Sequence, residues 1–157
     1  MRHLLGLFLS IQNDLYCIAK MKINNENDIE DIIQETMLSA YTNLKKLKNN
    51  SFFKTWIIRI LINKCNKFYK KKNLKSLDDK QEINIISTKE IELSTIEFEN
   101  FISFLTEEER TILTLYYSLS YTTKEIAQIL QKREGTICSK ISRAKTKIKE
   151  KYKGEFY

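Results

Sequence analysis

The sequence predicts an all-α protein built as two small helical bundles joined by a linker, and three observations support this fold class. The 157 residues include no proline and three glycines, so the residues that the tight turns of strand-rich folds require are scarce. Apolar side chains recur every three or four residues through most of the chain, which is the spacing of one helix face. The net charge changes sign along the chain, which indicates separate segments.

Two basic blocks are separated by an acidic one. Residues 45–80 carry twelve Lys or Arg against two Asp or Glu, for a net charge of +10, and residues 110–157 carry eleven against four, for +7. Residues 1–44 have a net charge of −3 and residues 81–109 of −7. Positive charge attracts phosphate through Coulomb forces and counterion release. The alternation therefore favours two contact surfaces for a polyanion over a uniformly solvated basic surface.

The first bundle is predicted over residues 1–73 as three helices. Residues 4–22 form the first helix, and either Asn27 or Asp28 is expected to cap the second, because a short side-chain oxygen accepts a free backbone N–H. The apolar face of the second helix comprises Ile29, Ile32, Ile33, Met37, Ala40, Tyr41 and Leu44. In the third helix, about 52–71, the buried stripe comprises Trp56, Ile57, Ile60, Leu61, Cys65 and Phe68, and the opposite side carries Arg59, Asn63, Lys67 and Lys70.

The N-terminal run from Leu4 to Leu9 can be interpreted as a signal peptide or as the start of a core helix. The core helix is favoured, because polar residues follow the run at once without a small-residue cleavage site. No stretch approaches the ~20 apolar residues of a membrane span. The three cysteines are far apart, and the single histidine, His3, cannot complete a zinc site. We expect free thiols, no metal, no cofactor and a cytoplasmic location.

Residues 74–92 are predicted to be an acidic, polar linker, and the second bundle is expected over residues 93–157. Thr106–Glu109 and Thr122–Glu125 both have the capping-box pattern, in which Thr and Glu satisfy each other's free N–H groups. The first box opens a helix with Ile112, Leu113, Leu115 and Tyr116 on its apolar face. The second opens a short helix over 124–130, and after the turn 131–133 a last helix, about 134–152, faces inward with Ile137, Ile141, Ala144 and Ile148.

A short helix, a tight turn and a longer basic helix form the pattern of a helix-turn-helix. In that motif the first helix crosses the DNA backbone and the second presents its exposed face to base edges in the major groove. The alternative is an ordinary helical hairpin with a solvated basic face; the small residues Ala127, Gly135 and Ala144, where helices approach, favour the DNA-binding motif. The predicted exposed stripe comprises Thr136, Lys140, Arg143 and Lys147, flanked by Ser139 and Ser142.

The stretch from 105 to 150, LTEEERTILTLYYSLSYTTKEIAQILQKREGTICSKISRAKTKIKE, resembles region four of sigma factors, the domain that reads the promoter's minus-thirty-five element. Two triplets and one pair match the family pattern at the right spacing: Glu125-Ile126-Ala127, Gly135-Thr136-Ile137 and Arg143-Ala144. Cys138 departs from the pattern, because the family often has Arg or Lys there. Together with the stripe, the resemblance implies these minus-thirty-five contacts: Arg133, Thr136, Cys138, Ser139, Lys140, Ser142, Arg143 and Lys147.

The stretch from 27 to 73 resembles sigma region two. Its run D-I-I-Q-E-T-M-L, Asp31 to Leu38, matches a family helix that grips a coiled coil of the polymerase beta-prime subunit. An acidic face with an exposed leucine suits a basic, partly apolar protein partner; the alternative is a solvated helix face. The resemblance implies that the core-polymerase-binding residues are Asp28, Asp31, Gln34, Glu35 and Leu38.

The segment S-F-F-K-T-W-I-I-R-I, Ser51 to Ile60, resembles the family's segment that opens the minus-ten element, and the loop at about 43–51 matches the one that captures a flipped base. Trp56 can be a core anchor or a base-stacking platform, and its place in the apolar stripe favours the core. The resemblance, with the charge of the third helix, implies these minus-ten contacts: Trp56, Arg59, Asn63, Lys64, Lys67, Lys70 and Lys71.

The two resemblances, in this order, identify the chain as a member of the extracytoplasmic-function sigma factors. The expected partners are RNA polymerase core, through its beta-prime and beta subunits, and promoter DNA; an anti-sigma factor is common in the family. The chain is not expected to be an enzyme, because no nucleophile–base set or glycine-rich phosphate loop is present. The alternatives are a stand-alone helix-turn-helix regulator that binds duplex DNA, and an interaction protein that titrates a partner.

Overall fold

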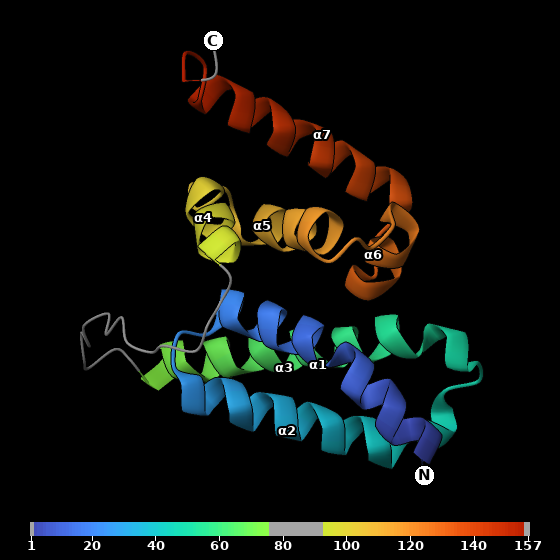
Figure 1. The fold of residues 1–157 in the computed structure, drawn as a ribbon. Coiled ribbons are helices and arrows are strands. Elements are labelled where there is room, and N and C mark those ends of the chain that lie inside the picture. Colours follow the sequence, from blue (N-terminus) through green and yellow to red (C-terminus); the bar gives the residue numbers. More distant parts are fainter. Residues whose placement is uncertain (1, 76–92, 156–157) are drawn as a thin grey trace. The chain divides into compact units, whose positions relative to one another are not determined.

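The computed structural model describes residues 2–75 and 93–155, and every regular element in these ranges is helical (Figure 1). The chain divides into two compact units, Met1–Thr88 and Lys89–Tyr157. The predicted all-α class is confirmed. The predicted linker, 74–92, lies outside the described residues except for its first two positions, which belong to a helix that continues to Lys75.

Three helices pack against one another in the first unit: α1 (Arg2–Lys22), α2 (Glu26–Asn43) and α3 (Phe53–Lys75). Two short 3-10 turns, η1 (Leu44–Lys46) and η2 (Asn50–Phe52), connect α2 to α3. Each helix contributes one apolar face to a shared core, as the sequence periodicity predicts. The buried side chains include Ile11, Leu15 and Ile18 of α1, Ile29, Ile32 and Ala40 of α2, and Phe53, Ile57, Ile58, Leu61 and Cys65 of α3.

Three predictions for the first unit are wrong in detail. Asn25, rather than Asn27 or Asp28, caps α2, because its side-chain oxygen accepts the Asp28 N–H at 3.2 Å. Tyr41 is 59% exposed although it was assigned to the apolar face. Ile58, missed by the predicted stripe, is fully buried. A helix covered by two neighbours buries a wider arc than a single stripe, which accounts for Ile58.

The second unit contains α4 (Leu93–Phe101), α5 (Glu107–Leu113), α6 (Thr123–Leu130) and α7 (Glu134–Lys151). A π-helical turn, η3 (Thr114–Ser118), continues α5. Helix α7 packs against both α5 and α6, and Figure 1 shows it running alongside them. The core comprises Ile102, Leu105, Ile112, Leu113, Leu115, Tyr121, Ile126, Ile129, Ile137, Ile141 and Ala144.

Both predicted capping boxes are present. Glu109 accepts the Thr106 N–H at 3.0 Å while Thr106 Oγ1 accepts the Glu109 N–H at 3.3 Å. The same reciprocal pair joins Thr122 and Glu125, at 2.8 and 3.1 Å. Helix α6 ends where Gln131 adopts the left-handed conformation, with φ 54° and ψ 46°. The predicted turn between α6 and α7 is thereby confirmed.

The C-terminal end of α7 is attached to α4. Tyr152 donates its hydroxyl proton to the Phe101 carbonyl at 2.9 Å. The two rings stack with their centroids 4.4 Å apart and an interplanar angle of 14°. Helix α7 is therefore held at its far end as well as along its length, which limits its freedom to pivot.

Candidate protein and nucleic-acid interfaces

Helix α2 carries an exposed acidic face. Asp31, Gln34 and Glu35 are exposed, and Asp28 is half-buried in the first turn. Leu38, one turn beyond Gln34, is 66% exposed. The structure therefore brings the five predicted core-polymerase-binding residues onto successive turns of one helix. Carboxylates around a solvent-exposed leucine can contact a partner that is basic and partly apolar.

Tyr41 extends this face beyond the predicted set. It follows Leu38 by three residues, and both side chains are more than half exposed. The spacing from Leu38 was the available signal, but Tyr41 also fits the spacing of the buried residues, so the pattern alone was ambiguous. Tyrosine is enriched at protein interfaces because its ring packs while its hydroxyl remains hydrogen-bonded.

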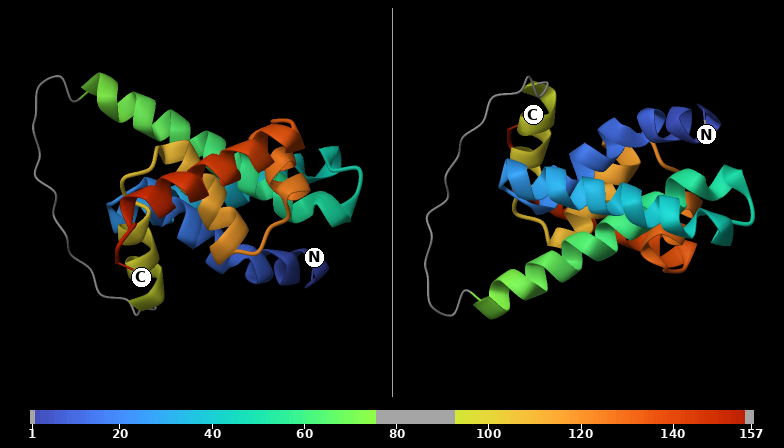
Figure 2. Two further views of the ribbon diagram at one scale, coloured as in Figure 1. Left: turned by 90° about the horizontal axis from the view of Figure 1, so that it is seen from above. Right: turned by 90° about the horizontal axis from the view of Figure 1, so that it is seen from below.

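Helix α3 carries a basic face on its outer side. Asn63, Lys67, Lys70 and Lys71 are exposed, and Arg59 is half-buried. The last turns of α3 project beyond α1 and α2, as both views in Figure 2 show. These side chains are not covered by the core of their own unit. The face can therefore contact a polyanion along about four helical turns.

Trp56 and Lys64 differ from the rest of the predicted minus-ten set. Trp56 is half-buried, and its ring centroid lies 6.2 Å from that of Phe53. A purely core position for Trp56 is thus excluded. Lys64 lies over α2, where its Nζ is 3.6 Å from the Glu35 carboxylate and its side chain is 27% exposed. This ion pair links the acidic and basic faces, although exposed pairs of this kind contribute little stability.

The loop between α2 and α3 combines positive charge with an exposed aromatic ring. Asn49 Oδ1 accepts hydrogen bonds from the Ser51 N–H at 2.9 Å and from its hydroxyl at 2.8 Å, which fixes the turn before α3. Phe52 is 48% exposed. The exposed lysines of the loop are Lys45, Lys46 and Lys48.

Helices α6 and α7 have the connectivity of a helix-turn-helix. The Lys132 N–H donates to the Ala127 carbonyl at 3.0 Å, which closes the turn. Thr123, the first residue of α6, donates its hydroxyl proton to Glu134, the first residue of α7, at 2.7 Å. This bond joins the N-terminal ends of the two helices, and in the motif the N-terminal residues of the second helix contact base edges.

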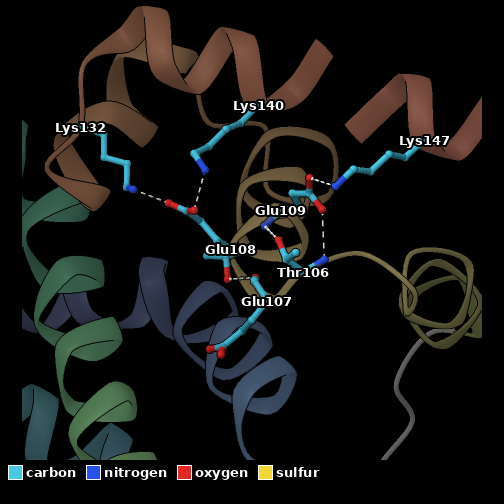
Figure 3. A network of polar contacts seen from close by, with 8 residues as sticks. Thr106, Glu107, Glu108, Glu109, Lys132, Lys140 and Lys147 are labelled. Atoms are coloured by element: carbon cyan, nitrogen blue, oxygen red, sulfur yellow. Dashed lines mark hydrogen bonds and ion pairs between the residues drawn. The ribbon is translucent and has the colours of Figure 1, made fainter. Parts of the chain in front are cut away.

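A polar network ties α7 to the first turn of α5 (Figure 3). Lys140 donates to Glu108 at 2.7 Å, and Lys147 donates to Glu109 at 2.6 Å. Lys132, in the turn before α7, also pairs with Glu108. Of the two lysines in the predicted exposed stripe, Lys147 is exposed as expected, whereas Lys140 is half-buried. Both lysines reach toward the acidic N-terminus of α5. The helix dipole stabilises carboxylates in this first turn, and these carboxylates in turn attract the two lysines.

The network lowers the pKa of both glutamates below the ordinary value of 4.5. For Glu108, the hydrogen bond from Lys132 has the largest effect, followed by that from Lys140. For Glu109, burial alone would raise the pKa, but the hydrogen bonds from Lys147 and from the Thr106 backbone outweigh burial. Both carboxylates are therefore charged at neutral pH, and the lysines remain engaged.

The rest of the predicted minus-thirty-five set lies on the outer surface of α7 and the preceding turn. Ser139 donates its hydroxyl proton to the Gly135 carbonyl at 2.9 Å, so this side chain folds back along its own helix. Cys138 is exposed, in contrast to the buried Cys65 and the partly buried Cys17. The exposed residues of the set are Arg133, Thr136, Cys138, Ser139, Ser142 and Arg143.

An aromatic–cation pair flanks α7, and the sequence pattern did not predict it. Lys145 Nζ lies 5.7 Å from the ring centroid of Tyr117, which is 48% exposed. Tyr116, assigned to the apolar face of α5, is half-buried and packs edge-on against Tyr117 at 4.9 Å. The π-helical turn changes the register at these residues, and no periodicity in the sequence signals that change.

Among residues 2–75 and 93–155, no group of three or more His, Cys, Asp or Glu side chains is arranged to hold a metal ion. No helix in these ranges combines the length and apolar character that membrane crossing requires.

Two family models match the chain in succession. Sigma-70 region 2 matches residues 7–74, which include α2 and nearly all of α3. The second model, Sigma-70, region 4, matches residues 96–148, which include the helix-turn-helix. Each matched range thus covers most of one of the two basic helices described above.

Relatives match over most of the chain. An "ECF RNA polymerase sigma-E factor" of Salmonella typhimurium is 30% identical over 143 residues, covering 79% of this chain and 73% of that protein. A protein of the same name from Haemophilus influenzae is 27% identical over 143 residues, with 81% and 76% covered. The sigma factor RpoE of Bartonella quintana, solved in complex with the anti-sigma factor NepR, has a similar fold, with a TM-score of 0.80, 21% identity, and 98% and 99% of the chains covered.

Proposed function

The chain belongs to the extracytoplasmic-function group of the sigma-70 family, and on this premise we propose that it binds RNA polymerase core and directs transcription initiation at specific promoters. One observation carries the proposal: an acidic–apolar helix face, a basic helix and a helix-turn-helix occur in one chain, in the family order. A regulator that only binds duplex DNA would need the helix-turn-helix alone. In this proposal the polymerase performs the catalysis, and the chain acts in the cytoplasm.

We assign a separate task to each part of the chain. Residues 1–73 bind the polymerase and the minus-ten element, residues 93–157 bind the minus-thirty-five element, and residues 74–92 link them. The net charges of +10 over residues 45–80 and +7 over residues 110–157 support two DNA contacts.

The acidic face of α2 is proposed to bind the polymerase, by analogy with the family helix that grips the beta-prime coiled coil. The exposure of Leu38, at 66%, supports the assignment, because the side chain is available as an apolar anchor. The surrounding carboxylates would steer the face toward a basic partner and set its orientation. The proposed contacts are Asp28, Asp31, Gln34, Glu35 and Leu38, with Tyr41 added from the structure.

The basic face of α3 and the loop before it are proposed to capture the opened minus-ten strand. An open strand offers bases for stacking and an unshielded backbone for charge contacts. Trp56 and Phe52 expose part of their rings for the first task. Lys64 is assigned a secondary role because it pairs with Glu35. The proposed charged and polar contacts are Arg59, Asn63, Lys67, Lys70 and Lys71.

The outer surface of α7 is proposed to read the minus-thirty-five element. Arg143 is exposed on this helix and can bond two acceptors of one guanine. Lys140 and Lys147 are reassigned from DNA contact to the network with α5, because their ammonium groups already bond Glu108 and Glu109. The proposed contacts are thus Arg133, Thr136, Cys138, Ser139, Ser142 and Arg143.

An anti-sigma factor is proposed as a further partner. The Bartonella quintana sigma factor of similar fold was solved in complex with such a protein. The exposed apolar side chains Leu5 and Leu9 of α1, at 60% and 62%, show that the first unit has contact area outside its acidic face.

The proposal is tested by transcription in vitro. The purified chain, core polymerase and sheared genomic DNA of the same bacterium are combined, and the 5′ ends of the transcripts are sequenced. We expect new 5′ ends only when chain and core are both present, each preceded by two shared short elements. DNA binding by the chain without core-dependent initiation would instead support a stand-alone regulator.

A further inference from the structure

Helix α7 begins with an acidic residue at the end that a helix-turn-helix presents to DNA. Glu134 is the first residue of α7 and is exposed. Its Oε1 accepts a hydrogen bond from Thr123 Oγ1 at 2.7 Å. Within the part of the chain that the structure describes, Glu134 forms no ion pair, in contrast to Glu108 and Glu109.

A carboxylate at this position weakens contact with phosphates, because like charges repel. The other exposed residues of the proposed surface are neutral or positive, with Arg133 directly before Glu134 and Arg143 further along. A negative charge within a surface for a polyanion becomes favourable for binding where a hydrogen-bond donor of the nucleic acid faces it. Base edges in the major groove provide such donors.

The chemistry of the carboxylate limits which bases it can accept. An ionised carboxylate only accepts hydrogen bonds. In the major groove the donors are the amino groups of cytosine and adenine, and Glu or Asp typically accepts from cytosine N4. Guanine N7 and O6 and thymine O4 are acceptors, so each of them repels the carboxylate. The group therefore selects for cytosine and against guanine and thymine.

The contact with Thr123 orients the carboxylate. A glutamate in the first turn of a helix is also favoured by the helix dipole, which is the purely structural explanation for Glu134. The dipole sets no particular side-chain direction, whereas a hydrogen bond to the first residue of a neighbouring helix does. With Oε1 engaged by Thr123, Oε2 remains available to a base edge at the N-terminal end of α7.

We propose that Glu134 is a specificity-determining residue that selects cytosine at one position of the upstream duplex element, with Thr123 as the positioning residue. The inference rests on the proposed function, because it requires that α7 enters the major groove. It goes beyond that function by naming the base that one side chain selects.

The test is a selection from random duplex DNA by the full chain assembled with core polymerase. We expect the unchanged chain to enrich cytosine at one upstream position. Glu134→Ala reduces that enrichment about tenfold, which corresponds to one lost base contact, and leaves neighbouring positions unaltered. Glu134→Gln moves the preference to adenine, because an amide pairs with adenine N6 and N7. Glu150→Gln, the same change at an exposed site near the other end of α7, is the matched control and keeps the cytosine.

Thr123→Val separates orientation from charge, because it removes the hydroxyl but retains the carboxylate. We expect a cytosine enrichment between those of the unchanged chain and Glu134→Ala. The inference is overturned if both Glu134 variants bind all sequences more tightly without a change at any position, since the carboxylate would then act only as a charge. If the unchanged chain enriches no sequence, the proposed function itself fails. If the unchanged chain and the Glu134 variants enrich the same sequence, this inference alone is contradicted.

Discussion

Glu109 joins two helices through separate oxygens of one carboxylate. Its Oε1 accepts a hydrogen bond from Lys147 Nζ at 2.6 Å, and its Oε2 accepts the Thr106 N–H at 3.0 Å. The first contact holds α7 and the second closes the N-terminus of α5. Glu109 is only 8% exposed, so water cannot readily replace either partner. The capping of α5 and the placement of α7 therefore depend on the same side chain.

We expect Glu109→Ala to lower the free energy of unfolding of the second unit by about 1–3 kcal/mol, because it removes a capping contact and leaves Lys147 unpaired. Glu109→Gln should lower it less, since the amide oxygen can still accept one bond. Thermal unfolding of the full chain, followed by circular dichroism, measures the change. Trp56, the single tryptophan of the sequence, lies in the first unit, and its fluorescence transition should not move. A shift of both transitions would contradict the local role of Glu109.

The stability of the second unit should depend on pH through Glu108 and Glu109. Their pKa values in the folded protein lie below the ordinary 4.5, so their contribution is fully present above that pH and is lost as the pH falls through the lowered values. Unfolding curves between neutral pH and about pH 3 measure the loss. A chain carrying both Glu108→Gln and Glu109→Gln should be less stable at neutral pH and should show a shallower decline. Parallel curves for the two proteins would rule out the network as the source.

Phe53 is expected to be a main support of the first unit. It is 1% exposed and meets Phe8 edge to face, with centroids 5.4 Å apart. Phe53→Ala should cost about 3–5 kcal/mol, because it leaves a cavity in the core. Its neighbour Phe52 is 48% exposed, so Phe52→Ala should change stability by less than about 0.5 kcal/mol. Denaturant titration monitored by Trp56 fluorescence compares the two; equal effects would contradict the observed burial.

Replacing Arg143 should affect base discrimination, whereas replacing Lys147 should affect the stability of the second unit. Arg143→Ala is expected to reduce discrimination at one upstream base pair by about 1–3 kcal/mol, the value of a bidentate base contact. Lys147→Ala should leave base preference unchanged and lower the stability of the second unit instead, because its ammonium bonds Glu109. Binding to single-base variants of the selected upstream duplex distinguishes the two. A loss of base preference in Lys147→Ala would return that lysine to the DNA-reading set.

Leu38 and Asp31 should control the affinity for core polymerase. Leu38→Ala removes an exposed apolar anchor and is expected to weaken binding by about 1–2 kcal/mol. Asp31→Lys reverses a charge on the same face and should slow association, most strongly at low salt. Glu30→Lys introduces the same charge change at an exposed position outside the proposed set. Competition between labelled and unlabelled chain for core measures all three, and similar losses for Glu30→Lys and Asp31→Lys would indicate a nonspecific charge effect.

The local signals of the sequence predicted the helices of the second unit well. Capping boxes at Thr106 and Thr122 depend on residues three positions apart, so they can be identified without tertiary information. The turn at Gln131 and the buried face of α7 followed from the same short-range patterns. The first unit was predicted less closely because Asn25, Asn27 and Asp28 are all competent caps. All three have a short side-chain oxygen that can accept a free backbone N–H, so the residue type alone does not choose among them.

The candidate surfaces were predictable as helix faces but not as networks. Exposure of Asn63, Lys67 and Arg143 followed from helical spacing. The pairing of Lys140 and Lys147 with Glu108 and Glu109 joins residues 32 and 38 positions apart, so it depends on the packing of α7 against α5. A charged side chain beside a buried helix face can contact DNA or pair with a neighbouring helix. Only the three-dimensional arrangement decides between these two roles.

The exposure of Cys138 gives the chain a single readily modified thiol on the outer surface of α7. Because Cys65 is buried and Cys17 is partly covered, a maleimide dye under mild conditions should attach at this position first, without any engineered substitution. The dye would lie within the proposed duplex-binding surface, where bound DNA should shield the thiol from the reagent. The rate of labelling with and without DNA can thus report whether DNA covers this surface in the unaltered protein.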